Sequence, residues 1–120
     1  MTRRLLVKVT CGPDDAERLS QALTVAATGV ASGVDVSLWL TGDATWLAVP
    51  GRVPDLGLEG AMPLADLVDS VLAGGRTTVC TQCAVRRGIT GDDVAAGVRI
   101  AGAASFLEEA LADDVQALVY

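Results

Sequence analysis

The sequence predicts an α/β fold in three layers, with helices on both faces of a five-stranded parallel sheet. Five short apolar runs alternate with helical segments along the chain, and this alternation is typical of parallel strands joined by right-handed crossovers. The first run, residues 4–10, is almost continuously apolar, as in strands that are covered on both faces. The chain has 120 residues, which fits one domain over residues 1–120. The order of the strands in the sheet does not follow from the sequence.

The first half of the chain contains one long helix between its first two expected strands. A Cys-Gly-Pro turn ends the first strand. Asp14 and Glu17 then resemble a capping box, with Asp14 as the cap, and apolar residues recur at helical spacing as far as Gly33. The second strand, residues 34–40, alternates apolar and polar side chains. This alternation predicts that one face of the strand is only partly covered.

The middle of the chain combines one irregular segment with one well-marked helix. A short helical turn is expected over residues 44–49. Residues 50–62 are rich in Gly and Pro, which predicts a mobile loop or an assembly surface. Pro63 suits the first position of a helix, and the glycine pair 74–75 is typical of a helix end. The third strand follows over residues 76–80.

The last third of the chain contains shorter elements. Thr90 is expected to cap a short helix over residues 92–96. A brief strand over residues 98–101 leads into a helix over residues 103–112. The last expected strand, residues 115–119, is apolar and lies at the end of the chain.

Charge and composition exclude several functional classes. Nine basic and 15 acidic residues give a net charge of −6, which argues against a nucleic-acid binder. The absence of His removes imidazole bases and His-based triads. No apolar run is long enough for a bilayer span, and the first residues show no signal-peptide pattern; a cytoplasmic protein without membrane contact is expected. The acidic pairs 108–109 and 113–114 are expected to face solvent.

The residues that point to chemistry are Cys11, Cys80 and Cys83. In a parallel sheet all three lie toward the carboxyl edge, where open α/β sheets bind ligands. If Cys80 ends a strand and a helical turn follows, the free N–H groups of that turn can stabilise its thiolate. Arg86 and Arg87 add positive charge close by in the sequence. We therefore expect a lowered pKa for Cys80, with both arginines stabilising the anion.

Simpler interpretations of these residues remain open. Cysteine is often simply buried, which suits Cys11 in particular, and Arg86 with Arg87 can form a solvated surface. A C-x-x-C pair beside a β-α-β pattern also occurs in dithiol oxidoreductases. A zinc site needs about four ligands, and one chain supplies only three Cys and no His. No nucleotide-binding glycine motif is present, so neither a metal nor a cofactor is expected.

Residues 79–89, which contain Cys80, Cys83, Arg86 and Arg87, resemble the signature loop of the DsrE/DsrF-like family. That family includes sulfur-relay subunits of the TusD type. The resemblance extends over most of the chain, through the Cys-Gly-Pro-Asp turn, the Ala-rich helix, the second strand and the acidic helix near the end. It implies an α/β/α domain with a five-stranded parallel sheet, assembled into trimers or hexamers.

The resemblance also implies a chemistry for the cysteines. Cys80 matches the position that carries sulfur as a persulfide in the relay proteins, and Cys83 stands where those proteins often have a small residue. Cys11 belongs to the wider resemblance, as an accessory position. The leading expectation is a sulfur carrier of sulfurtransferase type that receives sulfur from one persulfide protein and delivers it to another. A non-enzymatic oligomeric adaptor with structural cysteines and a dithiol redox protein are the alternatives.

Oligomerisation has a second, independent basis in the sequence. Trp39 and Trp46 lie on elements that are expected to be only half covered, so their side chains would form an exposed apolar patch. A homo-oligomer is therefore expected from composition as well as from the resemblance.

Overall fold

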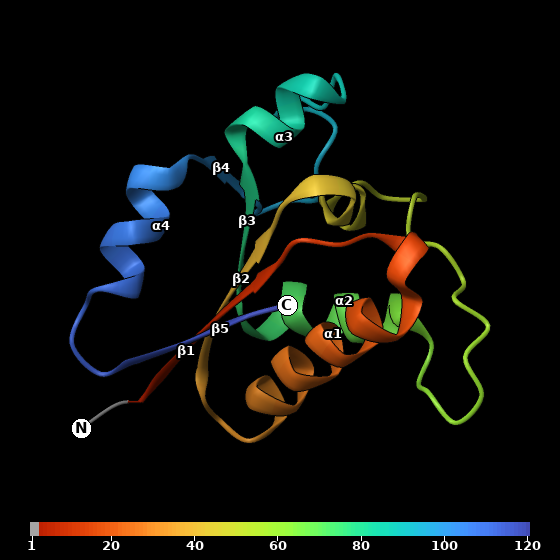
Figure 1. The fold of residues 1–120 in the computed structure, drawn as a ribbon, viewed down its shortest axis with the longest axis horizontal. Coiled ribbons are helices and arrows are strands. Elements are labelled where there is room, and N and C mark those ends of the chain that lie inside the picture. Colours follow the sequence, from red (N-terminus) through yellow and green to blue (C-terminus); the bar gives the residue numbers. More distant parts are fainter. Residues whose placement is uncertain (1–2) are drawn as a thin grey trace.

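Five parallel strands form one sheet at the centre of the computed structural model, which describes residues 3–120 (Figure 1). The strands are β1 (Arg4–Val9), β2 (Asp35–Leu40), β3 (Arg76–Cys80), β4 (Arg99–Ala101) and β5 (Val115–Val119). Their order is β4-β3-β2-β1-β5, and every neighbouring pair is parallel. The parallel α/β fold predicted from the sequence is confirmed, and the expected strands match to within one residue at each end.

The helices divide unequally between the two faces of the sheet. They are α1 (Ala16–Ala31), α2 (Leu64–Gly74), α3 (Thr81–Arg86) and α4 (Ala103–Ala110), with 3₁₀ helices at Pro13–Asp15 and Gly42–Ala48. The pair α1 and α2 covers one face, α4 lies on the other, and α3 follows β3 at the carboxyl edge (Figure 1). Residues 52–58 form neither helix nor strand. Among residues 3–120, no helix has the length and hydrophobicity that crossing a membrane requires.

The main core lies between the sheet and the pair α1 and α2. The apolar side chains of alternate strand positions, such as Val7, Val36 and Leu38, pack there against Leu23 and Val71 of the two helices. By contrast, α4 carries no fully buried side chain. Burial of apolar surface contributes about 25 cal/mol per Å². The α1 and α2 layer therefore supplies most of the stabilisation, and α4 needs other contacts to stay on the sheet.

The second strand is more deeply buried than its alternation predicts. Every residue from Val36 to Leu40 is buried, and Trp39 is only 2% exposed. The reason is that Phe106 of α4 packs edge-on against the Trp39 ring, with 5.3 Å between ring centroids. The prediction of a half-covered strand with an exposed Trp39 was therefore wrong. Trp46 is half-buried, with the Arg52 guanidinium 4.0 Å from its ring centroid.

Two local predictions were also wrong. The cap of α1 is Asp15, whose carboxylate accepts a hydrogen bond from the Arg18 N–H, because Asp14 lies inside the preceding 3₁₀ turn. Residues 92–96 form turns instead of a helix. The Asp93 carboxylate accepts hydrogen bonds from the N–H and hydroxyl of Thr90, at 2.8 and 3.0 Å. This contact resembles a capping box, but the chain does not continue into a helix after it.

Candidate functional site: a cysteine pair at the carboxyl edge of the sheet

The sheet topology brings all three cysteines to one edge, as predicted. Cys11 lies just beyond the end of β1, Cys80 is the last residue of β3, and Cys83 lies in the first turn of α3. All three are free thiols; Cys11 and Cys80 are half-buried and Cys83 is buried. No group of three or more Cys, Asp or Glu side chains within residues 3–120 converges as a metal site would.

Cys80 occupies the junction between a buried strand and a helix. It is the N-cap residue of α3, with an extended backbone (φ −64°, ψ 128°), so β3 passes into α3 without an intervening loop. Its side chain lies on the α4 face of the sheet, because Thr78, two residues earlier, hydrogen-bonds Arg99 there. Because Cys80 is the N-cap residue, its sulfur lies beside the free N–H groups of the first helical turn, those of Gln82 and Cys83.

The electrostatics of this junction favour a thiolate at Cys80. Burial raises the pKa of the thiol, but the Cys83 N–H, the Cys83 thiol and the Gln82 N–H, together with the positive charge of Lys8, outweigh it. The pKa of Cys80 is therefore below its ordinary value. The Cys80 side chain accepts no cap hydrogen bond within the usual geometric limits, so these groups lower the pKa through their proximity to the sulfur. A thiolate is the form of cysteine that attacks sulfur.

The Cys83 side chain contacts the backbone at Gly42, just after β2. The N–H of Gly42 lies 3.2 Å from the Cys83 sulfur, to which it donates a hydrogen bond. Gly42 has φ +55°, and a Cβ there would lie 3.1 Å from the Thr10 carbonyl oxygen. Glycine is therefore the residue this position favours. The turn that follows β2 thus aims a backbone donor at the second cysteine of the pair.

Cys11 lies at the same edge but in the opposite electrostatic environment. Burial raises the pKa of its thiol, and the negative charge of Asp15 raises it further, against a smaller opposing effect of Arg18. Cys11 is therefore held as a neutral thiol at pH values where Cys80 ionises more readily. Cys11 and Cys80 therefore differ in the direction in which the fold shifts the pKa of the thiol.

The two arginines predicted to stabilise the anion are bonded elsewhere. Arg86 is exposed and donates to the Gln82 side chain at 3.2 Å. Arg87 donates through Nε and Nη2 to one carboxylate oxygen of Asp43, at 3.1 and 2.9 Å, and through Nη1 to the Cys83 carbonyl oxygen at 3.1 Å. Arg87 therefore ties α3 to the turn that contains Gly42. The side-chain charge that lowers the pKa of Cys80 comes from Lys8.

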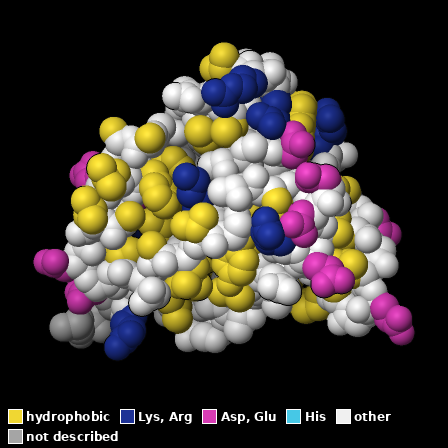
Figure 2. Space-filling model, viewed as in Figure 1, with side chains coloured by type: hydrophobic (Ala, Val, Ile, Leu, Met, Phe, Trp, Pro, Cys, Tyr) yellow, Lys and Arg dark blue, Asp and Glu magenta, His cyan; other side chains and the backbone are white. Residues whose placement is uncertain are grey.

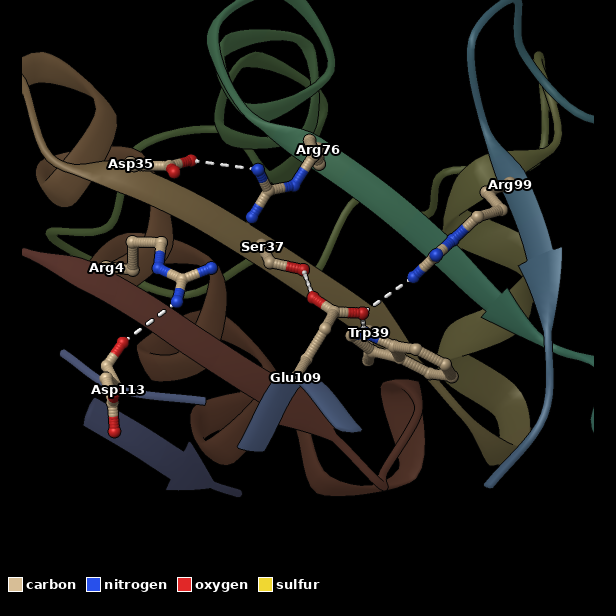
Figure 3. Close-up of polar contacts among 8 residues, drawn as sticks. All are labelled: Arg4, Asp35, Ser37, Trp39, Arg76, Arg99, Glu109 and Asp113. Carbon is tan, nitrogen blue, oxygen red and sulfur yellow. Dashed lines mark hydrogen bonds and ion pairs between the residues drawn. The ribbon is translucent and has the colours of Figure 1, made fainter. Parts of the chain in front are cut away.

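The sequence did not predict a polar cluster between α4 and the sheet (Figure 3). The Glu109 carboxylate accepts hydrogen bonds from the Ser37 hydroxyl at 2.6 Å, the Trp39 indole N–H at 2.9 Å and Arg99 Nη2 at 2.6 Å. Burial raises the pKa of Glu109, but these hydrogen bonds and the Arg99 charge outweigh it and lower the pKa. The prediction that Glu109 faces solvent was wrong. The available signal was a Ser and a Trp at alternate positions of a buried strand, whose polar atoms need partners.

This cluster shares a face of the sheet with Cys80. Arg99 also donates through Nε to the Thr78 hydroxyl at 3.3 Å, two residues before Cys80 on the same strand. The Lys8 ammonium, in register with Trp39, lies 4.8 Å from the Phe106 ring centroid. The contacts that attach α4 to the sheet therefore lie on the same face as the Cys80 side chain, and one of them is made by Thr78, two residues before Cys80.

Fold and site together define a small parallel α/β protein with a cysteine at the N-cap of a helix and a second cysteine one turn further on. The chain belongs to the DsrE/DsrF-like family, whose family model matches residues 3–116. Membership in this family suggests a role of sulfur-relay type.

Solved structures agree with this fold. The chain is similar to YchN from E. coli, with 20% identity and a TM-score of 0.70 over 100% of both chains. It is also similar to MTH1491 from Methanobacterium thermoautotrophicum, a protein of unknown function, with 13% identity and a TM-score of 0.70 over 98% of this chain and 99% of that one. At these identities the likeness shows the fold. No curated protein matches the chain significantly.

Proposed function

We propose that the protein is a sulfur carrier that accepts sulfane sulfur on Cys80 as a persulfide and passes it to an acceptor thiol. The observation that carries this proposal is the position of Cys80 as N-cap of α3, half-buried, with hydrogen-bond donors around its sulfur that lower the pKa of its thiol. Membership in the DsrE/DsrF-like family supports the same role.

The proposed transfer balances without an outside oxidant or reductant. The Cys80 thiolate attacks the outer sulfur of a donor persulfide, R–S–SH; the donor S–S bond breaks and R–S⁻ leaves with the electron pair. Cys80 now carries the outer sulfur as Cys80–S–SH. An acceptor thiolate then attacks that outer sulfur and releases the Cys80 thiolate, in the manner of thiol–disulfide exchange. The donor and the acceptor would each be a protein that carries a reactive cysteine.

The dithiol alternative is supported by one specific contact. Cys83 lies three residues after Cys80 on the first turn of α3, and its thiol contributes to the lowered pKa of Cys80, as expected of a pair close enough to form a disulfide. In that alternative, an external oxidant closes the pair and a reductant reopens it, with no sulfur carried. An adaptor with structural cysteines predicts neither reaction.

We also propose that copies of the chain associate through the α4 side of the sheet. Apolar side chains are visible on the face that carries α4 in Figure 2. Leu107 of α4 and Leu111, its C-cap residue, are 57% and 74% exposed. Val119, at the end of the edge strand β5, is 64% exposed. Light scattering should show a trimer or hexamer, and Leu111→Asp should shift it toward monomer, because a charge would be buried at the contact. A wild-type monomer at micromolar concentration contradicts the proposal.

Intact mass spectrometry tests the sulfur-carrier proposal. After incubation with a small-molecule persulfide and removal of the donor, the wild type should gain the mass of sulfur, and peptide mapping should place it on Cys80. Cys80→Ser should lose the adduct and Cys11→Ser should keep it. No adduct with a persulfide or a polysulfide donor contradicts the proposal, and a closed disulfide without prior sulfur uptake favours the dithiol alternative.

A further inference from the structure

Resting on the proposed persulfide at Cys80, we propose that Cys83 is a resolving thiol: it attacks the inner sulfur of Cys80–S–SH, releases sulfide and leaves a Cys80–Cys83 disulfide. The protein would then hold its sulfur only for a limited time. When no acceptor arrives, it would discharge the sulfur as sulfide. Four features of the described residues carry this inference.

The first feature is the spacing of the two cysteines on one helical turn. Cys80 is the N-cap of α3 and Cys83 lies three residues later, so both side chains lie on the same side of the first turn. The Cys83 thiol is close enough to the Cys80 sulfur to contribute to the lowering of its pKa. A disulfide requires Cβ atoms about 3.5–4.5 Å apart, so the first turn of α3 would adjust to that spacing when the pair closes.

The second feature is the difference in burial between the two sulfurs. Cys83 is only 9% exposed, while Cys80 is half-buried. An external donor therefore meets Cys80 first, and the outer sulfur of its persulfide points toward the accessible side. In this arrangement Cys83 would approach the inner sulfur from the buried side. Displacement at sulfur requires an approach opposite the leaving sulfide, and the deeper burial of Cys83 is compatible with that approach.

The third feature is the donor that supports the attacking sulfur. The Gly42 N–H, 3.2 Å from the Cys83 sulfur, stabilises negative charge on that atom as its proton leaves.

The fourth feature is the side chain that keeps this donor in place. Arg87 bridges the Asp43 carboxylate, next to Gly42, and the carbonyl oxygen of Cys83 itself. Arg87 is thus a positioning residue for the pair.

The step balances in atoms and electrons. Cys83–SH and Cys80–S–SH give Cys80–S–S–Cys83 and H₂S: a new S–S bond forms between the two cysteines, and the bond to the outer sulfur breaks. The departing sulfur takes the electron pair of the broken bond. It keeps the proton of the persulfide and gains the proton of the Cys83 thiol, and so leaves as H₂S. The outer sulfur is reduced to sulfide while the two cysteines become the disulfide. Two molecules of a small thiol, such as glutathione, then reduce the pair to two thiols and leave as the small-thiol disulfide.

The experiment loads the full-length protein with sulfur from a small-molecule persulfide, removes the donor and follows two signals without added thiol. Free sulfide is measured with a sulfide-sensitive probe, and the state of the cysteines is measured by intact mass and peptide mapping. The wild type should release one sulfide per loaded chain and gain the Cys80–Cys83 disulfide. Cys83→Ser keeps a hydrogen-bonding atom for the Gly42 N–H and should retain the Cys80 persulfide at least about tenfold longer.

Two further variants make the result unambiguous. Cys83→Ala should behave like Cys83→Ser, and it serves as the second test if the Ser variant folds poorly. Cys11→Ser, which leaves the pair intact, should discharge sulfide at the wild-type rate. Equal persulfide lifetimes in the wild type and both Cys83 variants overturn the resolving role while leaving the carrier function intact. Sulfide release without the Cys80–Cys83 disulfide also overturns it, and failure of every variant to take up sulfur on Cys80 overturns both proposals.

Discussion

Replacing Glu109 with alanine should destabilise the protein although the residue lies in an acidic pair on a short helix. The Glu109 carboxylate accepts three hydrogen bonds from Ser37, Trp39 and Arg99. Ser37 and Trp39 are 3% and 2% exposed, so their donors cannot turn to water when the carboxylate is removed. Since α4 has no fully buried side chain, these bonds are a main attachment of α4 to the sheet.

The magnitude follows from the groups left behind. A buried donor without a partner costs about 1–3 kcal/mol, and the alanine variant leaves two such donors, of which the Ser37 hydroxyl can rotate toward another acceptor. The lost pair with Arg99 adds at most about 1 kcal/mol, because that guanidinium is half exposed. We therefore expect Glu109→Ala to lower the free energy of unfolding by about 2–4 kcal/mol.

Urea unfolding followed by tryptophan fluorescence measures this effect, because Trp39 lies inside the cluster. The matched control is Glu108→Ala, the exposed neighbour on the same helix, which should stay within about 0.5 kcal/mol of the wild type. If Glu109→Ala and Glu108→Ala differ by less than about 0.5 kcal/mol, the cluster does not hold α4 and the reasoning fails.

Two further predictions concern acid and the link between α3 and the β2 turn. Because the pKa of Glu109 is lowered in the folded protein, its stabilisation is present above its unfolded pKa of about 4.3 and is lost as the pH falls through the folded value. The difference in unfolding free energy between the wild type and Glu109→Gln should therefore shrink in urea titrations below about pH 4, and a constant difference down to pH 3 contradicts this assignment. Arg87→Met removes the bridge from Asp43 to the Cys83 carbonyl and should cost about 1 kcal/mol, with faster amide hydrogen exchange in α3; unchanged exchange there would show that Arg87 does not tie the helix down.

The sequence was sufficient to place the cysteines because their position depends on topology. Continuous apolar runs and helix signals define the strands, and in a parallel sheet every strand ends at the same edge. Cys80 was therefore correctly assigned to the end of a strand and the start of a helix. The strand order was not predictable, because it depends on which neighbours pair across the sheet rather than on local pattern.

The surroundings of Cys80 were harder to predict, because they too depend on which strands are neighbours in the sheet. Arg86 and Arg87 are close in sequence, but α3 directs them toward Gln82 and Asp43. Lys8 comes from β1, far away in the chain; it shares the α4 face with Trp39, and the strand order places β1 two strands from β3. Electrostatic partners across a sheet are set by register, which a single sequence does not reveal.

The most direct test of the central claim is the pH dependence of alkylation at Cys80, measured peptide by peptide with iodoacetamide in the wild-type protein. Cys11 serves as an internal reference, because its pKa is raised while that of Cys80 is lowered. The rate at Cys80 should inflect below the ordinary thiol value of about 8.5, and at lower pH than the rate at Cys11. An inflection for Cys80 at or above that of Cys11 would contradict the claim that the first turn of α3 prepares this sulfur as a nucleophile.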